Sequence, residues 1–365
     1  MRVLIIGSAD TIWVKTMIKK THLSFGDDIS ILSSTNSVFT DYYQENNVKV
    51  FPLKAIENDG ISGMINNLKV LFKGYDLLIV HYVGENFARW GYIGSIFTKK
   101  LLLSFWGSDI LREERANKAV KKAIKASYAM VITTDDMIEK FHVLYGNSFD
   151  SKIRRAYYGS NGIELISGIA DIDDIKQYYG IDKNKIVVSI GHNKMVQQQH
   201  LKVLQEILKL PIEIRNKIHL VLRLTYGNGD DDYVSSIKQY VKNTECSSTI
   251  LESFMTDKEV AEITAITDIF IHAQTTDARS ASMCEHLYAK CLVVNPSWIK
   301  YSDLEDSVFY LKFNSFDELP KIISNNLVNK NNSPYKMKLY ANTDAIYNLC
   351  SWDRFIPEWR KIYAE

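Results

Sequence analysis

Residues 270–295 hold two carboxylates where a nucleotide could bind. An apolar strand-like run is followed by a polar loop containing Asp277, and a helix is expected to begin near Ser280 or Ser282. Glu285 would lie about one turn into that helix, and the unpaired amides of the first turn suit a diphosphate. An acidic side chain there can accept hydrogen bonds from ribose hydroxyls. The alternative is a capping box formed by Ser282 and Glu285, which would only stabilise the helix start.

Three side chains of the N-terminal half have the chemistry of a general base, namely Asp10, His81 and Asp109. Asp10 follows the first apolar run, His81 lies near the end of the run DLLIVHY, and Asp109 follows LLLSFWG. Two of them also have a structural interpretation. His81 can be a satisfied histidine at a strand end, and Asp109 can be the N-cap of a helix that begins near Leu111.

Gly7 and Trp106 are candidates for ligand contact in the same half. The turn GSADT, residues 7–11, has no side chain at Gly7, so a ligand can approach the backbone there. The turn is not GxGxxG, and a dinucleotide cofactor is therefore not expected. Trp106 can stack on a sugar ring, although an aromatic residue after an apolar strand is more often part of the core.

Apolar strand-like runs alternate with amphipathic helical stretches along the chain, which indicates parallel sheets covered on both faces. In the first half the helices are expected near residues 12–20, 61–72, 88–98 and 111–127, and a second series starts at IVVSIG, residues 186–191. The predicted fold class is α/β, with two Rossmann-like domains in tandem and ligands beyond the carboxyl ends of the strands. The expected parts are an N-terminal domain over 1–156, a linker over 157–184, a C-terminal domain over 185–340, and helices over 341–365 that can pack back on the N-terminal domain.

Length and composition agree with two domains. The chain has 365 residues, of which 46% are hydrophobic, and no stretch of about 18 uncharged apolar residues or cleavable signal pattern. A cytoplasmic protein is therefore expected. The net charge of +1 gives no reason to expect nucleic acid as a partner. The four cysteines lack metal-ligand spacing, so neither disulfides nor zinc are expected.

The spacing of Asp277 and Glu285, D-x7-E, resembles the E-x7-E element of GT-B glycosyltransferases, especially the retaining family 4. In that family the second acid contacts ribose and the first faces the donor sugar. Three further segments resemble GT-B loops in order and rough spacing: SIGHNK at 189–194, LRLTYGNGD at 222–230, and LLLSFWGSDIL at 101–111. The resemblance implies two Rossmann-like domains with a cleft between them, with the donor in the C-terminal domain and the acceptor in the N-terminal domain.

The resemblance also implies roles for individual residues. The donor-binding candidates are Gly191, His192, Asn193, Lys194, Arg223, Tyr226, Gly227, Arg279, Ser280, Ser282 and Glu285. The acceptor-binding candidates are Gly7, Thr11, Trp106 and Gly107, and the catalytic candidates are Asp277, Asp109, His81 and Asp10.

The chain departs from family 4 at the usual cations for the diphosphate. His192 or Asn193, and Gln198, stand where that family places Arg and Lys. SIGHNK and the TYG of residues 225–227 look closer to the bacterial 4-acetamidofucosyltransferases, an inverting lineage of the same fold. Compensating charge could come from Lys194, Arg223 or Arg279, since a guanidinium binds phosphate through two hydrogen bonds.

The expected activity is transfer of a sugar from a nucleoside-diphosphate sugar to a hydroxyl of a glycan or lipid-linked saccharide, in bacterial cell-surface polysaccharide synthesis. No separate cofactor and no metal are expected, and the acidic run at 230–232 is better explained as the start of a helix. Two alternatives are a sugar-nucleotide 2-epimerase of the same architecture and a catalytically silent subunit that scaffolds a glycan-assembly complex. The missing Arg and Lys motivate the second.

Positive charge is concentrated in the N-terminal half. Residues 1–155 carry 21 Lys and Arg against 16 Asp and Glu. Within the helix expected over 111–127, basic residues recur at intervals of three and four, which places Arg115, Lys118, Lys122 and Lys125 on one face with Lys121 beside them. Such a face predicts reversible contact with anionic lipids at the inner leaflet, and a solvated surface helix is the alternative.

Overall fold

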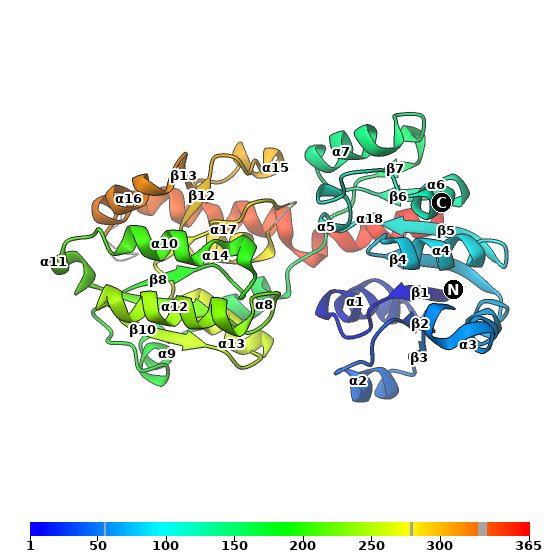
Figure 1. Cartoon of the computed structure of the whole chain (residues 1–365), viewed down its shortest axis with the longest axis horizontal. Coiled ribbons are helices and arrows are strands. Elements are labelled where there is room, and N and C mark those ends of the chain that lie inside the picture. Colours follow the sequence, from blue (N-terminus) through cyan, green and yellow to red (C-terminus); the bar gives the residue numbers. More distant parts are fainter. Residues whose placement is uncertain (55, 278–279, 328–333) are drawn as a thin grey trace. The chain divides into compact units, whose positions relative to one another are not determined.

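The computed structural model describes residues 1–54, 56–277, 280–327 and 334–365 (Figure 1). The chain forms two compact units, of which unit 1 comprises Met1–Tyr158 and Trp352–Glu365 and unit 2 comprises Gly159–Ser351. Each unit contains one parallel sheet with helices packed on it. The predicted α/β class with two Rossmann-like domains is confirmed.

The sheet of unit 1 has the strand order β3-β2-β1-β4-β5-β6-β7. Its strands are short and almost wholly buried at the centre, as expected for a parallel sheet covered on both faces. The strands are β1 (Arg2–Gly7), β2 (Asp28–Ser33), β3 (Lys49–Pro52), β4 (Tyr75–His81), β5 (Thr98–Ser104), β6 (Ala129–Val131) and β7 (Ile153–Arg154). The helices are α1 (Ile12–Met17), α2 (Thr40–Glu45), α3 (Ile56–Leu71), α4 (Glu85–Gly94), α5 (Ser108–Leu111), α6 (Lys118–Ala126), α7 (Asp135–Tyr145) and α18 (Trp352–Ala364), with shorter helical turns at Ile18–His22, Leu23–Phe25 and Asp150–Lys152.

Alternate strand residues of unit 1 pack on opposite faces of its sheet. Val3 and Ile5 belong to a core cluster with residues of α1 and α18. The other face is covered closely by α4, because a Cβ at Gly91 would lie 2.5 Å from Cγ2 of Val80 and one at Gly94 would lie 2.6 Å from Cδ2 of Leu78. These two glycines therefore set the distance between α4 and the sheet.

The last helix, α18, completes the core of unit 1. Trp352, Phe355 and Trp359 are buried in the same cluster as the residues of β1 and α1. The indole N–H of Trp359 donates to the carbonyl of Tyr157 at 2.8 Å. The guanidinium of Arg360 bonds Oδ2 of Asp27 at 2.6 Å. Residues 352–365 are thus part of the N-terminal unit.

The sheet of unit 2 has the strand order β10-β9-β8-β11-β12-β13. The strands are β8 (Ile186–Ile190), β9 (Ile218–Arg223), β10 (Ser247–Leu251), β11 (Ile269–Ile271), β12 (Leu292–Pro296) and β13 (Leu311–Phe313). The helices are α8 (Asn161–Ser167), α9 (Ile172–Tyr178), α10 (His200–Ile207), α11 (Ile212–Arg215), α12 (Asp231–Thr244), α13 (Asp257–Ile266), α14 (Ala281–Tyr288), α15 (Ser302–Glu305), α16 (Leu319–Asn325) and α17 (Lys336–Cys350), with turns of 3-10 helix at Val196–Gln198 and Phe316–Glu318. The segment 157–184, for which the sequence predicts a linker, contains α8 and α9 and belongs to unit 2 from Gly159 onward.

The prediction of a single helix over residues 111–127 is wrong. The structure has two helices there, α5 and α6, with residues 112–117 between them. The connecting segment is rich in charged side chains and largely exposed, so it has no apolar face to bury against the sheet. Asn117 then starts α6 as its N-cap, because Oδ1 accepts from the amides of Ala119 at 2.8 Å and Val120 at 3.2 Å. Arg115 therefore lies outside the basic helix.

The described residues also bear on the cysteines, on membrane-spanning helices and on metal sites. All four cysteines are buried. None of the described helices has the length and apolar character needed to cross a membrane. The described His, Cys, Asp and Glu side chains form no group of three or more that could hold a metal ion.

Candidate functional site

The loop that follows β11 leads into α14, and Ser280 is the N-cap of this helix. The hydroxyl oxygen of Ser280 accepts from the amide of Met283 at 3.1 Å. Met283, rather than Glu285, therefore occupies the third position of the helix, and the capping box considered for Ser282 and Glu285 is not formed. Both side chains are left for other contacts.

Glu285 is held by the start of α8, a segment more than a hundred residues earlier in the chain. Its Oε1 accepts from the hydroxyl of Ser160 at 2.6 Å, and Oγ of Ser160 in turn accepts from the amide of Gly162 at 3.1 Å. A Cβ at Gly162 would lie 2.4 Å from both Cδ and Oε1 of Glu285, so any larger residue there would displace the Glu285 carboxylate. Burial raises the pKa of Glu285, and the bond from Ser160 and the charge of Arg223 oppose that rise.

Arg223 brings a buried positive charge to the end of β9. The side chain donates to Oγ of Ser282 at 3.1 Å, and its Nε has no hydrogen-bond partner among the described residues. Burial lowers the pKa of the guanidinium, and the nearby Glu285 carboxylate opposes this. A buried guanidinium with so few partners is suited to bind an anion.

Three more buried polar atoms lack a described partner near Arg223: Nδ1 of His192, Oε1 of Gln198 and Nε2 of His200. Burial holds the pKa of His192 well below its ordinary value, and the charge of Arg223 adds to the effect, so this ring is neutral. Gly191 has φ +61, and a Cβ there would lie 2.8 Å from Nε2 of His200. Buried polar groups are nearly always hydrogen-bonded, so this cluster after β8 and β9 is suited to a polar ligand.

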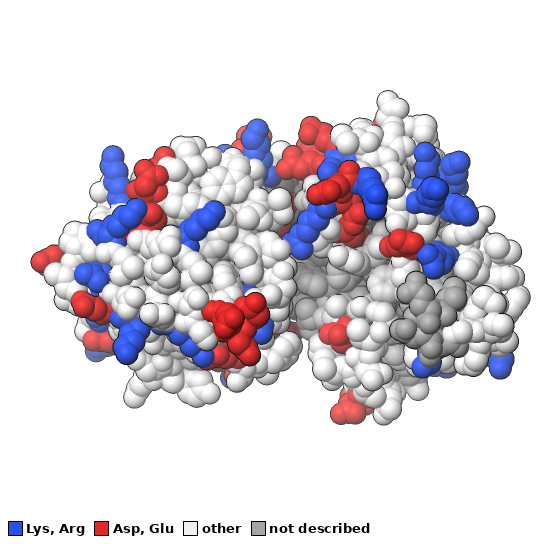
Figure 2. Space-filling view, in the orientation of Figure 1, with Lys and Arg blue, Asp and Glu red and all other residues white. Residues whose placement is uncertain are grey.

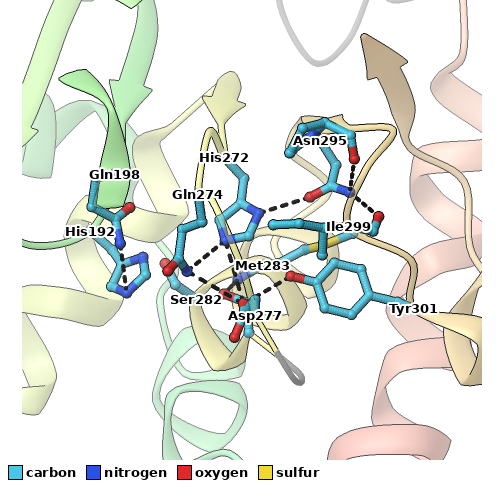
Figure 3. Close-up of polar contacts among 12 residues, drawn as sticks. His192, Gln198, His272, Gln274, Asp277, Ser282, Met283, Asn295, Ile299 and Tyr301 are labelled. Carbon is cyan, nitrogen blue, oxygen red and sulfur yellow. Dashed lines mark hydrogen bonds and ion pairs between the residues drawn. The ribbon is translucent and has the colours of Figure 1, made fainter. Parts of the chain in front are cut away.

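His272 directly follows β11, and its two ring nitrogens contact Asn295 and Gln274 (Figure 3). The amide nitrogen of Asn295 donates to the carbonyls of Pro296 and Ile299, so its Oδ1 accepts from Nδ1 of His272 at 2.8 Å. Nε2 then accepts from the side-chain amide of Gln274 at 3.0 Å. Burial lowers the pKa of His272, which keeps the ring neutral.

Asp277 is positioned by the same network. Its Oδ2 accepts from the hydroxyl of Tyr301 at 2.8 Å and lies 3.6 Å from Nε2 of His272 (Figure 3). Its side chain is partly exposed, at 18%, whereas His272 is fully buried. Asp277 therefore presents a fixed carboxylate at the surface edge of unit 2.

The loop after β8 and the loop after β9, which contain several donor-binding candidates, are joined by a backbone hydrogen bond. The amide of Lys194 donates to the carbonyl of Tyr226 at 2.8 Å, and Oδ1 of Asn193 accepts from the amide of Met195 at 2.9 Å. Gly227 has φ +125, and a Cβ there would lie 2.6 Å from Cγ of Met195. Asn193 and Gly227 thus shape the loops, and the Tyr226 side chain is exposed.

In unit 1, Asp109 fixes the loop after β5. Its Oδ1 accepts from the amides of Trp106 and Gly107, both at 2.9 Å, and its Oδ2 accepts from the amide of Val83 at 2.7 Å. The prediction that Asp109 is an N-cap is wrong, because Gly107, with φ +109, occupies the N-cap and α5 begins at Ser108. Burial raises the pKa of Asp109 from 3.8 to about 6 in spite of the three amides.

This raised pKa predicts a pH-dependent contribution to stability. The folded protein binds the proton more tightly than the unfolded chain, so the contribution is complete below pH 3.8 and is lost as the pH rises through about 6. Lowering the pH from 7 to 5 should raise the free energy of unfolding of the wild type, relative to Asp109→Asn, by about 1 kcal/mol. Urea titrations of both proteins at the two pH values measure it. A constant difference would show that Asp109 does not titrate in this range.

His81, at the end of β4, is fully buried beside an aromatic cluster. The indole N–H of Trp106 donates to Nδ1 of His81 at 3.3 Å, which assigns the ring proton to Nε2, and this nitrogen has no described partner. Burial lowers the pKa of His81 to about 3, so the ring is neutral. In this tautomer His81 offers a hydrogen-bond donor. The rings of Tyr82 and Tyr158 lie 6.3 and 6.0 Å from that of Trp106.

Asp10 lies beside a pocket of unit 1. Its Oδ1 accepts from the hydroxyl of Thr35 at 2.9 Å. Thr35 also lines a pocket of about 360 Å³ formed with α2, β3 and the rest of the loop after β2. Thr11 caps α1, since its hydroxyl accepts from the amide of Val14 at 3.4 Å, and a Cβ at Gly7 would make only ordinary contacts with His81.

The contacts link some of the candidates within each unit. In unit 1 they connect Asp109, Trp106 and His81. In unit 2, Arg223 contacts Ser282, and Glu285 contacts Ser160. Asp277 contacts Tyr301 and Gln274. Gln274 directly follows a predicted strand, but Ser160, Gly162 and Tyr301 carry no motif, so the sequence offers no signal for those three. Arg279 lies outside the described residues.

Comparisons with known proteins agree with this architecture. Residues 2–134 match the family model described as Glycosyl transferase 4-like. No curated protein shows significant sequence similarity to the chain.

Solved structures resemble the chain over its whole length. A glycosyltransferase from Rickettsia africae ESF-5 is 14% identical, with a TM-score of 0.80 over 99% of this chain and 97% of its own. Alr3699/HepE from Anabaena, in complex with UDP and glucose, is 15% identical, with a TM-score of 0.78 over 100% and 99%. WaaG, a glycosyltransferase involved in lipopolysaccharide biosynthesis, is 11% identical, with a TM-score of 0.69 over 100% and 99%.

At these identities the likeness establishes the fold, and together with the family match it confirms the resemblance to GT-B glycosyltransferases. The chain therefore has the two-domain GT-B fold, and residues 2–134 carry the pattern of the Glycosyl transferase 4-like family.

Proposed function

We propose that the chain transfers a sugar from a nucleoside-diphosphate sugar to a hydroxyl of a glycan or lipid-linked saccharide. The observation that carries the proposal is the buried Arg223 guanidinium, with its unpartnered Nε, beside Ser282 and Glu285 at the end of β9. A diphosphate would supply the missing partners of the cation, and the Glu285 carboxylate would accept from ribose hydroxyls. The UDP and glucose bound to Alr3699/HepE, which has the same fold, support this choice of donor class.

The acceptor is assigned to unit 1. The pocket of about 360 Å³ beside Asp10 falls within the range of about 300 to 1,000 Å³ typical of small-ligand sites. Its lining combines hydroxyl and amide side chains, Thr35, Ser37 and Gln44 among them, with the apolar Val48 and Pro52. Such a surface suits a neutral sugar ring, which has polar edges and apolar faces. A role in bacterial cell-surface polysaccharide synthesis follows from this proposed acceptor class and from the likeness to WaaG.

The test begins with the donor. Thermal melting with UDP, GDP, TDP and CMP should single out one of the three diphosphates, because a ligand at a hundred times its dissociation constant stabilises a protein by about 2.7 kcal/mol. The matching nucleotide sugar is then incubated with glycan acceptors, and the products are analysed by mass spectrometry. A new glycosidic bond supports the proposal and excludes epimerisation. A sugar nucleotide recovered as its epimer, or recovered unchanged without hydrolysis, would overturn it.

We also propose that the transfer needs no metal ion, because Arg223 and the amides at the start of α14 would neutralise the leaving diphosphate. Protein dialysed against EDTA should keep most of its transfer rate when assayed in EDTA. Rates with and without added Mg²⁺ or Mn²⁺ provide the measurement. A rate that is abolished by EDTA and restored by either ion would contradict this prediction.

A further inference from the structure

An apolar stripe on α3 is exposed to solvent. Ile61, Met64, Ile65 and Phe72 are exposed by 74, 37, 45 and 62%, and they recur at the three- and four-residue spacing of one helix face with Phe72 just past the helix end. The opposite side of the helix contributes Val70 to the core. We call these four exposed residues the α3 stripe.

The apolar surface continues past α3 to the end of α4. The rings of Phe72 and Phe97 lie 4.3 Å apart, and a Cβ at Gly94 would lie 3.0 Å from Cδ2 of Leu71, so the two helix ends are in contact. Ile96, between Gly94 and Phe97, is 68% exposed. Exposed apolar side chains gathered on neighbouring helices are a feature of places of contact with a partner or a membrane.

Basic side chains border this surface. Helix α6 packs beside α4, where Nζ of Lys122 lies 5.9 Å from the centre of the Tyr92 ring. Val120 and Ile124 of α6 are buried, and its exposed lysines are Lys118, Lys121, Lys122 and Lys125. No described carboxylate forms an ion pair with any of the four. Figure 2 shows Lys and Arg side chains gathered over α6.

We propose that this surface of unit 1 docks on an anionic lipid bilayer. The α3 stripe and Ile96 would enter the boundary between head groups and acyl chains, while the lysines of α6 meet the anionic head groups. Unpaired lysines favour a bilayer over a protein partner, because protein interfaces are depleted in lysine. The inference rests on the surface alone and does not depend on the proposed sugar transfer.

Sedimentation with vesicles tests the proposal on the full chain. Vesicles of phosphatidylcholine alone are compared with vesicles containing phosphatidylglycerol, at low and at high salt. One variant removes the apolar part by Ile61→Ser, Ile65→Ser and Phe72→Ser. A second reverses Lys118, Lys121, Lys122 and Lys125 to Glu. The matched control changes exposed apolar residues elsewhere, Val143→Ser and Met337→Ser, which are 79 and 84% exposed.

The wild type and the control should bind only the anionic vesicles and release at high salt. Each of the first two variants should lower the partition coefficient at least about tenfold while keeping the wild-type melting temperature. Absence of wild-type binding at low salt would overturn the proposal. Unchanged binding of the apolar variant would also overturn it, as would a dimer in solution that the apolar variant dissociates, because a second copy would then cover the surface.

Discussion

Replacing Arg223 by glutamine is expected to lower the affinity for the nucleoside diphosphate at least about thirtyfold, which corresponds to about 2 kcal/mol. The diphosphate would lose a desolvated cation at the end of β9. The free protein should be as stable as the wild type or more stable, because its buried guanidinium has an unpartnered Nε and a single described bond, to Ser282. Calorimetric titration gives the affinity, and thermal melting without nucleotide gives the stability.

Arg215 provides a matched control for this experiment. Arg215 lies before the start of β9, and its side chain is 17% exposed. Its Nε also lacks a described partner, and its Nη1 donates to the carbonyl of Thr244 at 2.7 Å. Arg215→Gln should leave the nucleotide affinity unchanged. The companion variant Arg279→Gln and the double variant with Arg223→Gln complete the series. Wild-type affinity in both single variants and in the double variant would show that neither guanidinium contacts phosphate.

Gly162→Ala is expected to reduce both the stability of unit 2 and its affinity for the nucleotide. The new Cβ would lie 2.4 Å from the Glu285 carboxylate, so Glu285 must leave its bond with Ser160. Overpacking of this kind costs about 1 to 3 kcal/mol, and we expect the upper part of that range because the hydrogen bond is lost as well. Urea unfolding and calorimetric titration measure the two effects.

Two further variants separate the contact from the helix. Gly168→Ala lies at the other end of α8, where a Cβ would meet only the carbonyl of Leu165 at 3.5 Å, and it should be tolerated. In a Glu285→Ala background, which itself should weaken nucleotide binding, Gly162→Ala should become neutral or stabilising, because alanine is the better helix former. A stability loss equal to that in the wild-type background would mean that Glu285 is not the group it meets.

The sequence predicts the sheets well because their signal is local. The apolar runs that become β1, β4, β5 and β8 are continuous, and parallel strands buried on both faces require that composition. The break between α5 and α6 was missed, since basic residues at helical spacing over 111–127 conceal the N-cap at Asn117. Periodicity reports a helix face and gives little information about where the helix starts.

The candidate site was predictable only in part, for a different reason. Asp277 and Glu285 could be found from their spacing along one loop and helix. The residues that hold them, Ser160 and Tyr301, reach them through the tertiary fold at separations of 125 and 24 residues. Whether Glu285 caps its own helix or contacts another segment depends on α8, and no local pattern carries that information.

The place of α18 has a consequence for the order in which the chain can fold. All of unit 2 lies between the two segments of unit 1, and Trp352, Phe355 and Trp359 fill the core formed by β1 and α1. During synthesis the ribosome therefore delivers every residue of the C-terminal unit before the N-terminal unit has its last helix. Residues 1–158 emerge with a sheet whose apolar face still lacks these aromatic side chains. Their core can be completed only after residues 352–365 have been synthesised. Residues 1–158 are thus synthesised before unit 2, whereas the core that they form is completed after it.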